Sequence, residues 1–482
     1  MPLLLGLLAG LCAAVGLSLS NGLLALGHPG GALGGTAFGV GCLAALGATA
    51  SDAPGGRRAA WLSALGLGAL LPGLARPNPS LEIEFGIDRN LLLPQLAERF
   101  GDGGLQPLAW GIALPLSALG AALVLALPAR RALLVRALLV LLAGSFLVAA
   151  AFENPRVEAE TARPPVAGNY TMDAFLYLRV QDLLKQGSGY YRAFYLAYTQ
   201  RSGPRDEPQN TFNWRPPALF YLWSLVPGGP RELLAVFRGL AVLALVAAFG
   251  LVRTRVDEGL ALGAPALLGA YFLYGAVTPW FATQEYWASA FMLIGFWGWM
   301  SGRPGVGALF LALAVASREH FGFLLLPLLF LVVRGSGRER AWAAGALLAV
   351  GIFYLGHLAF VSGLVRSGNP GLAFWRAGGL EFLRSCLEFG TVYVAGRAWL
   401  WFPLLAAGAL GACLPGDARA RALLASSALV PLGVFLFLGQ EQRFYWGVAA
   451  VPQLLVAVPL LGGLLGAAAP AVPPGTSGEL ES

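Results

Sequence analysis

Charged side chains are scarce in this chain, and those that interrupt its apolar runs are the candidates for chemistry. Of 482 residues, 57% are hydrophobic and 12% are charged. An ionisable group beside hydrocarbon is energetically expensive, so it deserves a functional hypothesis. Asp173 is the first such group, because a carboxylate at the mouth of a membrane cavity can act as a general base. Asp173 also falls in the expected first turn of an amphipathic helix, where capping is the alternative role.

A second polar group, Arg318-Glu319-His320, separates two apolar runs that are short for membrane spans. Helices of about fourteen residues are roughly 21 Å long, so their shared turn is expected below the membrane surface. Arginine binds phosphate through a planar fork of donors, which suits the phosphate of a lipid carrier. The alternative is a local ion pair between Arg318 and Glu319 at an interfacial turn.

Two further candidates flank apolar runs on the same predicted side. Glu285 stands at the start of one run, and Arg443 precedes the last one. Arg443 is expected to pair either with a phosphate or with Glu441, or else to serve as a snorkelling anchor. Tyr445 beside it is typical of the aromatic belt at a membrane interface.

Arg215 is followed by Pro216-Pro217 and a short aromatic run that ends near Pro227. Paired prolines favour the first turn of a helix, and about eleven residues reach only half way across a hydrocarbon core. We therefore expect either a half-helix that enters the membrane from outside or an amphipathic helix on its surface.

The elements that must position these residues are membrane spans. A span needs about 20 apolar residues, and by that measure an all-α, polytopic transmembrane bundle of about fourteen spans is predicted. Four cysteines without CxxC spacing and three distant histidines support neither a disulfide framework nor a metal centre. The predicted spans lie near residues 2–26, 32–50, 59–75, 109–128, 132–152, 232–252, 259–278, 286–301, 304–317, 320–334, 341–362, 397–414, 421–439 and 443–466.

Arginine distribution orients these spans. Every short arginine-bearing loop falls on one side, which the positive-inside rule makes cytoplasmic together with both termini. With no basic residue before Arg57, the first span is expected to be retained rather than cleaved as a signal peptide. The net charge of +7 serves orientation, so nucleic-acid binding is not expected. Longer segments at 77–108, 153–230 and 363–396 lie outside, the last as an interfacial amphipathic helix, and 467–482 is an expected disordered tail.

Several motifs on the predicted outer side occur in a characteristic order. Asp173 precedes Tyr177, and Gly187 and Tyr190 come after a small helix. The segment Arg215-Pro216-Pro217-Ala-Leu219 follows, and then the polar turn at 317–320. The last motif is Arg443-Phe444-Tyr445, which stands before a helix with Pro452. In these features residues 132–466 resemble the GT-C superfamily of integral-membrane glycosyltransferases. The resemblance implies a catalytic module at 129–466 with its outer loop at 153–230. The four-span extension at 1–128 has no counterpart in the minimal GT-C module, and the tail at 467–482 follows the module.

The resemblance also implies an activity. A multi-pass enzyme of a bacterial-type plasma membrane would move a hexose or pentose from a polyprenyl-phosphate donor to a glycan, lipid or protein acceptor at its outer face. Asp173 would be the base, with Asp182 or Glu285 as alternatives, and inversion at the anomeric carbon is expected. No metal or other cofactor is implied. The implied substrate-binding residues are Arg443, Arg318, Glu319, His320, Glu285, Tyr177, Tyr190, Arg215 and Tyr445.

Other functions compatible with the sequence are a transporter or flippase of lipid-linked sugars, an oligosaccharide polymerase or ligase, and a non-catalytic scaffold. A transporter would be expected to carry polar residues through the midplane of several helices, often with inverted repeats.

Overall fold

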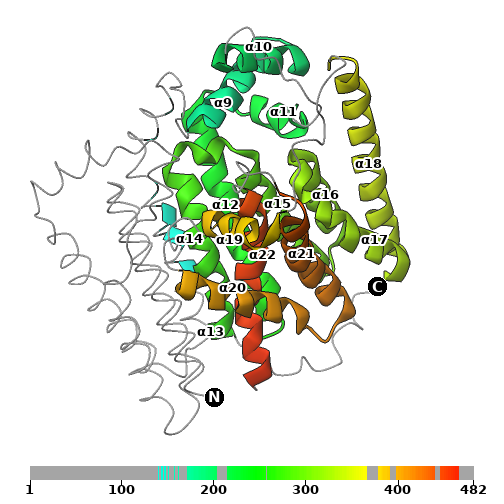
Figure 1. Ribbon diagram of the computed structural model, residues 1–482. Coiled ribbons are helices and arrows are strands. Elements are labelled where there is room, and N and C mark those ends of the chain that lie inside the picture. The colour runs from blue at the N-terminus through cyan, green and yellow to red at the C-terminus, as the bar shows by residue number, and fades with distance from the viewer. Residues whose placement is uncertain are drawn as a thin grey trace, which may run out of the picture.

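A computed structural model describes the chain mainly between residues 171 and 465. It covers residues 171–202, 214–256, 258–365, 378–390, 398–439 and 446–465, with single helical residues between 139 and 161. Within these ranges the protein is all-helical and contains no strand, as predicted (Figure 1). The first four predicted spans, the 1–128 extension, the 467–482 tail, Arg443 and Tyr445 all lie outside the described residues.

Three of the described helices are long and apolar enough to cross a membrane: α12 (Pro230–Arg253), α18 (Gly337–Ser362) and α21 (Ala418–Phe437). A helix of 24 residues such as α12 is about 36 Å long, which exceeds a hydrocarbon core of about 30 Å. These helices match the predicted spans at 232–252, 341–362 and 421–439. They identify the chain as a membrane protein by length and composition.

The other predicted spans in the described region are helices as well, but shorter ones. Predicted span 320–334 consists of a 3-10 turn, η5, followed by a short helix, and the described part of span 443–466 is a helix continued by η8. The short helices are α13 (Glu258–Ala261), α14 (Gly263–Val277), α15 (Gln284–Met300), α16 (Pro304–Ser317), α17 (Leu325–Arg334), α20 (Ala398–Cys413) and α22 (Gly447–Ala457), with 3-10 segments η4 (Pro279–Ala282), η5 (Glu319–Leu324) and η8 (Val458–Leu465).

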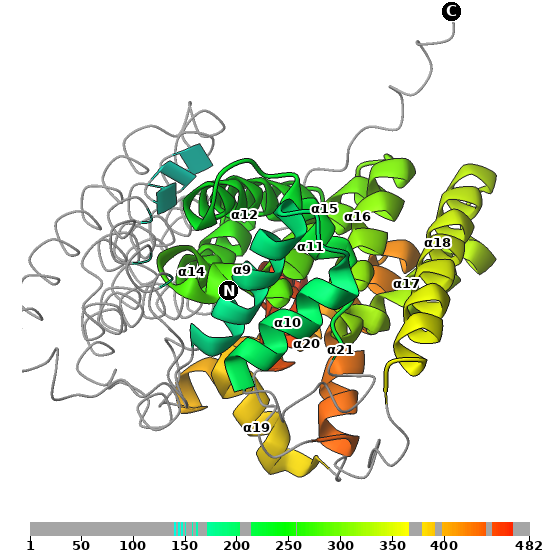
Figure 2. The ribbon, with the colours of Figure 1, turned by 90° about the horizontal axis from the view of Figure 1, so that it is seen from above.

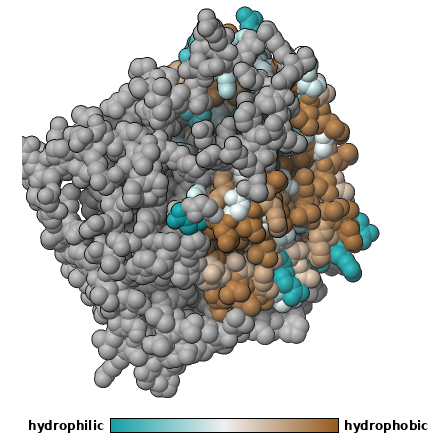
Figure 3. Space-filling view, in the orientation of Figure 1, coloured by the Kyte–Doolittle hydropathy of each residue, from teal (hydrophilic) through white to brown (hydrophobic). Residues whose placement is uncertain are grey.

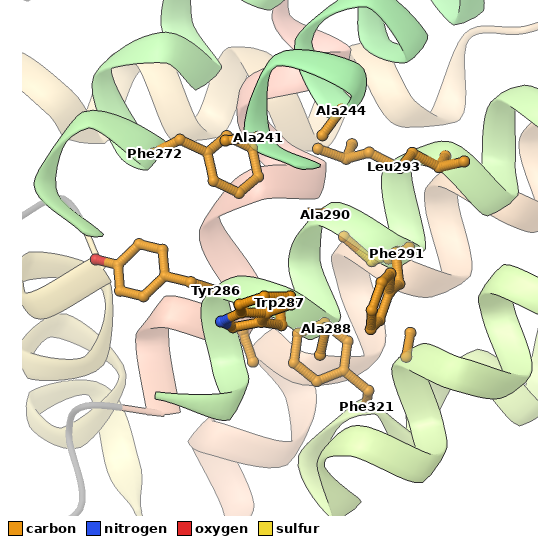
Figure 4. Close-up of a cluster of buried hydrophobic side chains, with 14 of the residues drawn as sticks. Ala241, Ala244, Phe272, Tyr286, Trp287, Ala288, Ala290, Phe291, Leu293 and Phe321 are labelled. Carbon is orange, nitrogen blue, oxygen red and sulfur yellow. The ribbon is translucent and has the colours of Figure 1, made fainter. Parts of the chain in front are cut away.

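Helix α15 forms the centre of the described bundle, because nearly all of its residues are buried. It packs against α12 and α16, and Figure 4 shows its side chains Tyr286, Trp287 and Phe291 among apolar neighbours. The approach of α15 to α16 depends on glycine: a Cβ on Gly298 would lie 2.7 Å from the backbone nitrogen of Gly307. Small residues allow this close packing of helices in membranes.

The bundle has two chemically different ends. At one end the turns between helices are joined by ion pairs, Arg255 to Asp417 at 3.0 Å and Arg419 to Glu339 at 2.7 Å. We call it the arginine-rich end, since it also carries Arg334, Arg338, Arg340 and Arg421. The predicted grouping of the loops near residues 255, 338 and 419 is therefore present.

Short helices cover the opposite end (Figures 1 and 2). They are α9 (Thr171–Lys185), α10 (Tyr190–Ser202) and α11 (Ala218–Ser224). The helix predicted to begin at Met172 and to stop at Gly187-Ser-Gly189 is confirmed as α9, and the chain leaves it through Gly187, whose φ of +86° favours glycine. Helix α11 has only seven residues. It buries Leu219, Phe220 and Trp223, so it is packed within protein on that face.

Helix α19 (Gly379–Gly390) confirms that the 363–396 segment contains a helix. Its Phe382 and Cys386 are buried against Phe435 of α21 and Trp446 at the start of α22. The Phe382 and Trp446 rings meet edge to face, 6.0 Å between centroids. The apolar face of α19 therefore packs on the ends of two helices.

Candidate functional site

Five polar side chains from separate segments meet at the end of the bundle covered by α9, α10 and α11. They are Tyr177 on α9, Arg215 just before α11, Glu285 in the first turn of α15, Arg318 at the end of α16 and Glu319 in η5. We call these five residues the charge cluster. All five were predicted site residues, and the structure brings them together.

Arg318 lies at the centre of the charge cluster. Helix α16 ends at Ser317, and Arg318 adopts extended backbone angles that break the helix. Its side chain is only 1% exposed; Nε lies 2.8 Å from Oε1 of Glu285, and Nη1 lies 3.3 Å from Oε1 of Glu319. A buried guanidinium requires such partners, because an unpaired charge in the interior is strongly destabilising.

Glu319 connects the two arginines of the cluster. The same Oε1 that approaches Arg318 also lies 3.4 Å from Nη1 of Arg215. Burial by itself raises the pKa of Glu319, but the positive charges of Arg318, His320 and Arg215 outweigh it and lower the pKa to about 2. Glu319 is therefore a carboxylate held in its ionised form and is poorly suited to accept a proton.

Arg215 links the segment before α11 to helices α9 and α10 by hydrogen bonds. Its Nε donates to the Tyr177 hydroxyl at 3.1 Å, and its carbonyl oxygen accepts from the Tyr190 hydroxyl at 2.5 Å. Burial raises the pKa of Tyr177 to about 12, against the opposing effect of Arg215. Tyr177 is therefore a neutral hydroxyl that accepts a hydrogen bond from Arg215. Tyr190 is completely enclosed and holds α10 against the same segment.

Asp173 lies at the margin of the charge cluster. It occupies the first turn of α9, one turn before Tyr177, and its charge adds to the rise in the Tyr177 pKa. The side chain is partly exposed. Asp182, nine residues further on, points to the opposite side of α9, since nine residues at about 100° each amount to two and a half turns. Asp182 is exposed and forms an ion pair with Arg179 at 2.5 Å.

His320 faces a different neighbourhood from the rest of the predicted turn. Its ring lies 4.7 Å from that of Trp446, centroid to centroid. This contact places the start of α22, and hence the chain just after Tyr445, beside the turn that carries Arg318. Arg443 and Tyr445 themselves stay predictions.

The structure adds one polar contact that the sequence reasoning missed. His357, near the end of α18, lies 3.0 Å through Nδ1 from the Tyr191 hydroxyl, and its Nε2 lies 3.3 Å from the carbonyl oxygen of Trp214. Tyr191 also stacks on Phe360, with ring centroids 4.0 Å apart. The available signal was that His357 is the one Asp, Glu, Lys, Arg or His residue of α18 beyond its first turn, and a charged or basic residue within an apolar run is the criterion that identified Arg318.

The two arginines and two glutamates of the charge cluster balance in formal charge. Glu285 and Arg318 are closed off from solvent, Arg215 and Glu319 are mostly buried, and Asp173 is the more accessible carboxylate beside them. No group of three or more His, Cys, Asp or Glu side chains capable of holding a metal occurs among the described residues. The arrangement can hold one partly exposed carboxylate, that of Asp173, next to a buried set of hydrogen-bonding groups.

Comparison with known proteins gives no assignment for this site. No family model, no curated protein and no solved structure matches the chain.

Proposed function

We propose that this protein is a membrane glycosyltransferase of the GT-C type, which moves a sugar from a polyprenyl-phosphate donor to an acceptor hydroxyl. One observation carries the proposal: the five candidate residues of the charge cluster come from four separate stretches of sequence, and ion pairs and hydrogen bonds join them around Arg318. The all-helical architecture and the three apolar helices are consistent with it. The proposed site lies at the end opposite the arginine-rich end, which is the outer side in the predicted orientation.

Asp173 is the proposed base. A general base must be reachable by substrate and able to accept a proton at neutral pH. Glu285 is enclosed and paired with Arg318, and Asp182 faces away from the cluster. Asp173 is partly exposed and borders the cluster through Tyr177.

In the proposed reaction the acceptor hydroxyl gives its proton to the Asp173 carboxylate as its oxygen attacks the anomeric carbon. A bond forms between that oxygen and the carbon, the bond from the carbon to the lipid-phosphate oxygen breaks, and the lipid phosphate leaves with the electron pair. A single displacement inverts the anomeric carbon. Arg443 is the proposed partner of the leaving phosphate. Arg318 is already matched by two carboxylates, so we assign it to holding Glu285 and Glu319 in place.

The test compares purified full-length protein in liposomes with two variants, Asp173→Asn and Asp182→Asn. Both substitutions remove one carboxylate from the same helix, which makes Asp182→Asn the matched control. The donors are radiolabelled polyprenyl-phosphate hexoses and pentoses, and a cell-envelope extract supplies acceptors. We expect label transfer that depends on the extract, is abolished by Asp173→Asn and survives in Asp182→Asn.

Two results would contradict the proposal. Transfer that persists in Asp173→Asn would remove Asp173 as the base. Label that crosses the bilayer without transfer to any acceptor would indicate a flippase instead. Chain-length growth of the labelled product would favour the polymerase or ligase alternative.

A further inference from the structure

The corner where α17 meets α18 concentrates positive charge at the arginine-rich end. Helix α17 ends at Arg334, and α18 begins at Gly337 after the connection Gly335-Ser336. Arg334, Arg338 and Arg340 are all exposed there. We call these three residues the arginine corner. Because the connection is so short, the three guanidinium groups share one small region of the surface.

The nearby carboxylate does not neutralise the positive charge of the arginine corner. The carboxylate within it, Glu339, lies 2.7 Å from Nη1 of Arg419 and accepts from the backbone nitrogen of Ser336 at 2.8 Å. Glu339 is buried by these contacts. Among the described residues, none of the three corner arginines forms an ion pair. The corner therefore presents three positive charges outward.

Apolar side chains extend from the arginine corner along both helices. On α17 the exposed side chains Leu326, Leu329 and Val333 recur at helical spacing, so they share one face. On α18 the corresponding stripe is Leu348, Ile352 and Leu355, each more than 60% exposed. Figure 3 shows a hydrophobic surface on the side of α17 and α18, with hydrophilic residues at the lower corner where the two helices meet.

Trp342 lies between the charges and the apolar stripe along the axis of α18, on the face that packs on α16. It is half exposed, and its ring packs on α16, since a Cβ on Gly305 would lie 3.2 Å from it. Tryptophan prefers the headgroup level of a bilayer, where one part of the ring is apolar and the other wet. Along α18, from its first residue onward, the basic residues therefore come first, the interfacial tryptophan second and the apolar stripe third.

We propose that the arginine corner is a binding site for an anionic diacyl phospholipid. Guanidinium groups match phosphate in geometry and charge, and basic residues beside membrane helices attract anionic headgroups. The phosphodiester would lie on Arg334, Arg338 and Arg340, and the acyl chains would follow the stripes of α17 and α18. A free phosphate ion would use the arginines alone, whereas this site joins them to an apolar surface. The proposal does not depend on the sugar-transfer activity.

The experiment measures lipid retention by the full chain. Detergent-purified protein is given equal amounts of phosphatidylglycerol and phosphatidylcholine, and bound lipid is counted by native mass spectrometry. One variant is Arg338→Gln/Arg340→Gln, and the matched control is Arg192→Gln/Arg253→Gln, which removes the same charge from two exposed arginines elsewhere. Size-exclusion profile and Tm verify that both variants fold.

We expect the native chain to retain phosphatidylglycerol in preference to phosphatidylcholine, and the corner variant to lose about fivefold or more of that preference. The control variant should keep it. Equal retention of the two lipids by the native chain would overturn the proposal, and so would an equal loss in the control variant. Displacement of phosphatidylglycerol by millimolar inorganic phosphate would also overturn it, because the apolar stripes would then contribute nothing.

Discussion

The guanidinium Nε of Arg318 lies 2.8 Å from Oε1 of Glu285, and the two side chains are 1% and 7% exposed. This ion pair joins the end of α16 to the first turn of α15, a helix with nearly all of its residues buried. It therefore couples the proposed site to the core of the bundle. Several expectations about stability and activity follow from its burial.

Removing Arg318 should destabilise the protein strongly. Arg318→Met leaves Glu285 and Glu319 without their closest positive partner, and loss of one partner from a buried pair costs roughly 3 to 5 kcal/mol. Thermal unfolding in detergent is the measurement. Replacing Glu285 together with Arg318, as Glu285→Gln/Arg318→Met, should cost less than the sum of the two single changes, because no lone charge is left buried. Additive losses would mean that the two residues do not interact.

Acid should weaken the charge cluster only at low pH. The folded-state pKa of Glu319 is about 2, below the ordinary value of 4.5. A lowered carboxylate pKa stabilises the fold above the unfolded value, and that stabilisation is lost as pH falls from 4.5 toward 2. The difference in Tm between the native chain and Glu319→Gln should therefore be constant above about pH 5 and shrink below it. A difference that instead changes between pH 6 and 8 would assign the titration to another group.

Tyr177→Phe should impair the site more than the fold. The change removes the hydroxyl that accepts from Nε of Arg215 at 3.1 Å, at an expected cost of about 1 to 3 kcal/mol for the donor left without it. Since Arg215 also contacts Tyr190 and Glu319, sugar transfer should fall even at temperatures well below the Tm of the variant, where the protein stays folded. Tyr198→Phe on α10 is the matched control. An identical loss of transfer in both variants would argue against a specific role for Tyr177.

Gly298→Ala should disrupt the packing of α15 on α16. The added Cβ would lie 2.7 Å from the backbone nitrogen of Gly307, and backbone cannot move aside as a side chain can. We expect a loss of roughly 1 to 3 kcal/mol in stability by thermal unfolding. Gly351→Ala on α18 is the control, since nothing lies within 4 Å of its Cβ position. Equal Tm values for the two variants would show that the helices separate more readily than the structure indicates.

The sequence predicted much of the local structure, because apolar run length and arginine position are properties of single segments. The helices at 230–253, 337–362 and 418–437 follow from apolar runs with arginine near their ends. The end of α9 follows from Gly187, whose positive φ a side chain would disfavour. Glu285, Arg318 and Glu319 were found because they begin or interrupt apolar runs, and Arg215 because it precedes the paired prolines of a short one. Tyr177 was found only through the order of motifs that resembles the GT-C superfamily.

The pairings within the site could not be predicted in the same way. Arg318 was expected to bind a phosphate or to pair with its neighbour Glu319, and its 2.8 Å contact with Glu285 joins residues 33 positions apart. Such contacts depend on how α15 and α16 pack, which no single segment encodes. The contacts of His357 could not be predicted from α18 alone either, since its partners Tyr191 and Trp214 belong to a different part of the chain.

Membrane sidedness is the last prediction, and it follows from the two ends of the bundle. The arginine-rich end should face the cytoplasm by the positive-inside rule, and the end with the charge cluster should face outward. Gly416, beside the Asp417–Arg255 ion pair, and Gly189, between α9 and α10, are exposed with nothing within 4 Å of their Cβ positions. Either can therefore be changed to cysteine without a clash. The background is a chain whose four native cysteines are replaced by alanine.

In intact cells a membrane-impermeant maleimide should label Gly189→Cys and leave Gly416→Cys unlabelled until the membrane is permeabilised. Each position is the control for the other, because both cysteines are exposed and differ only in the end of the bundle they occupy. The reverse pattern would invert the orientation and place the charge cluster in the cytoplasm. Asp173 would then lack access to an outer-leaflet donor, so this outcome would also remove the topological basis of the proposed reaction.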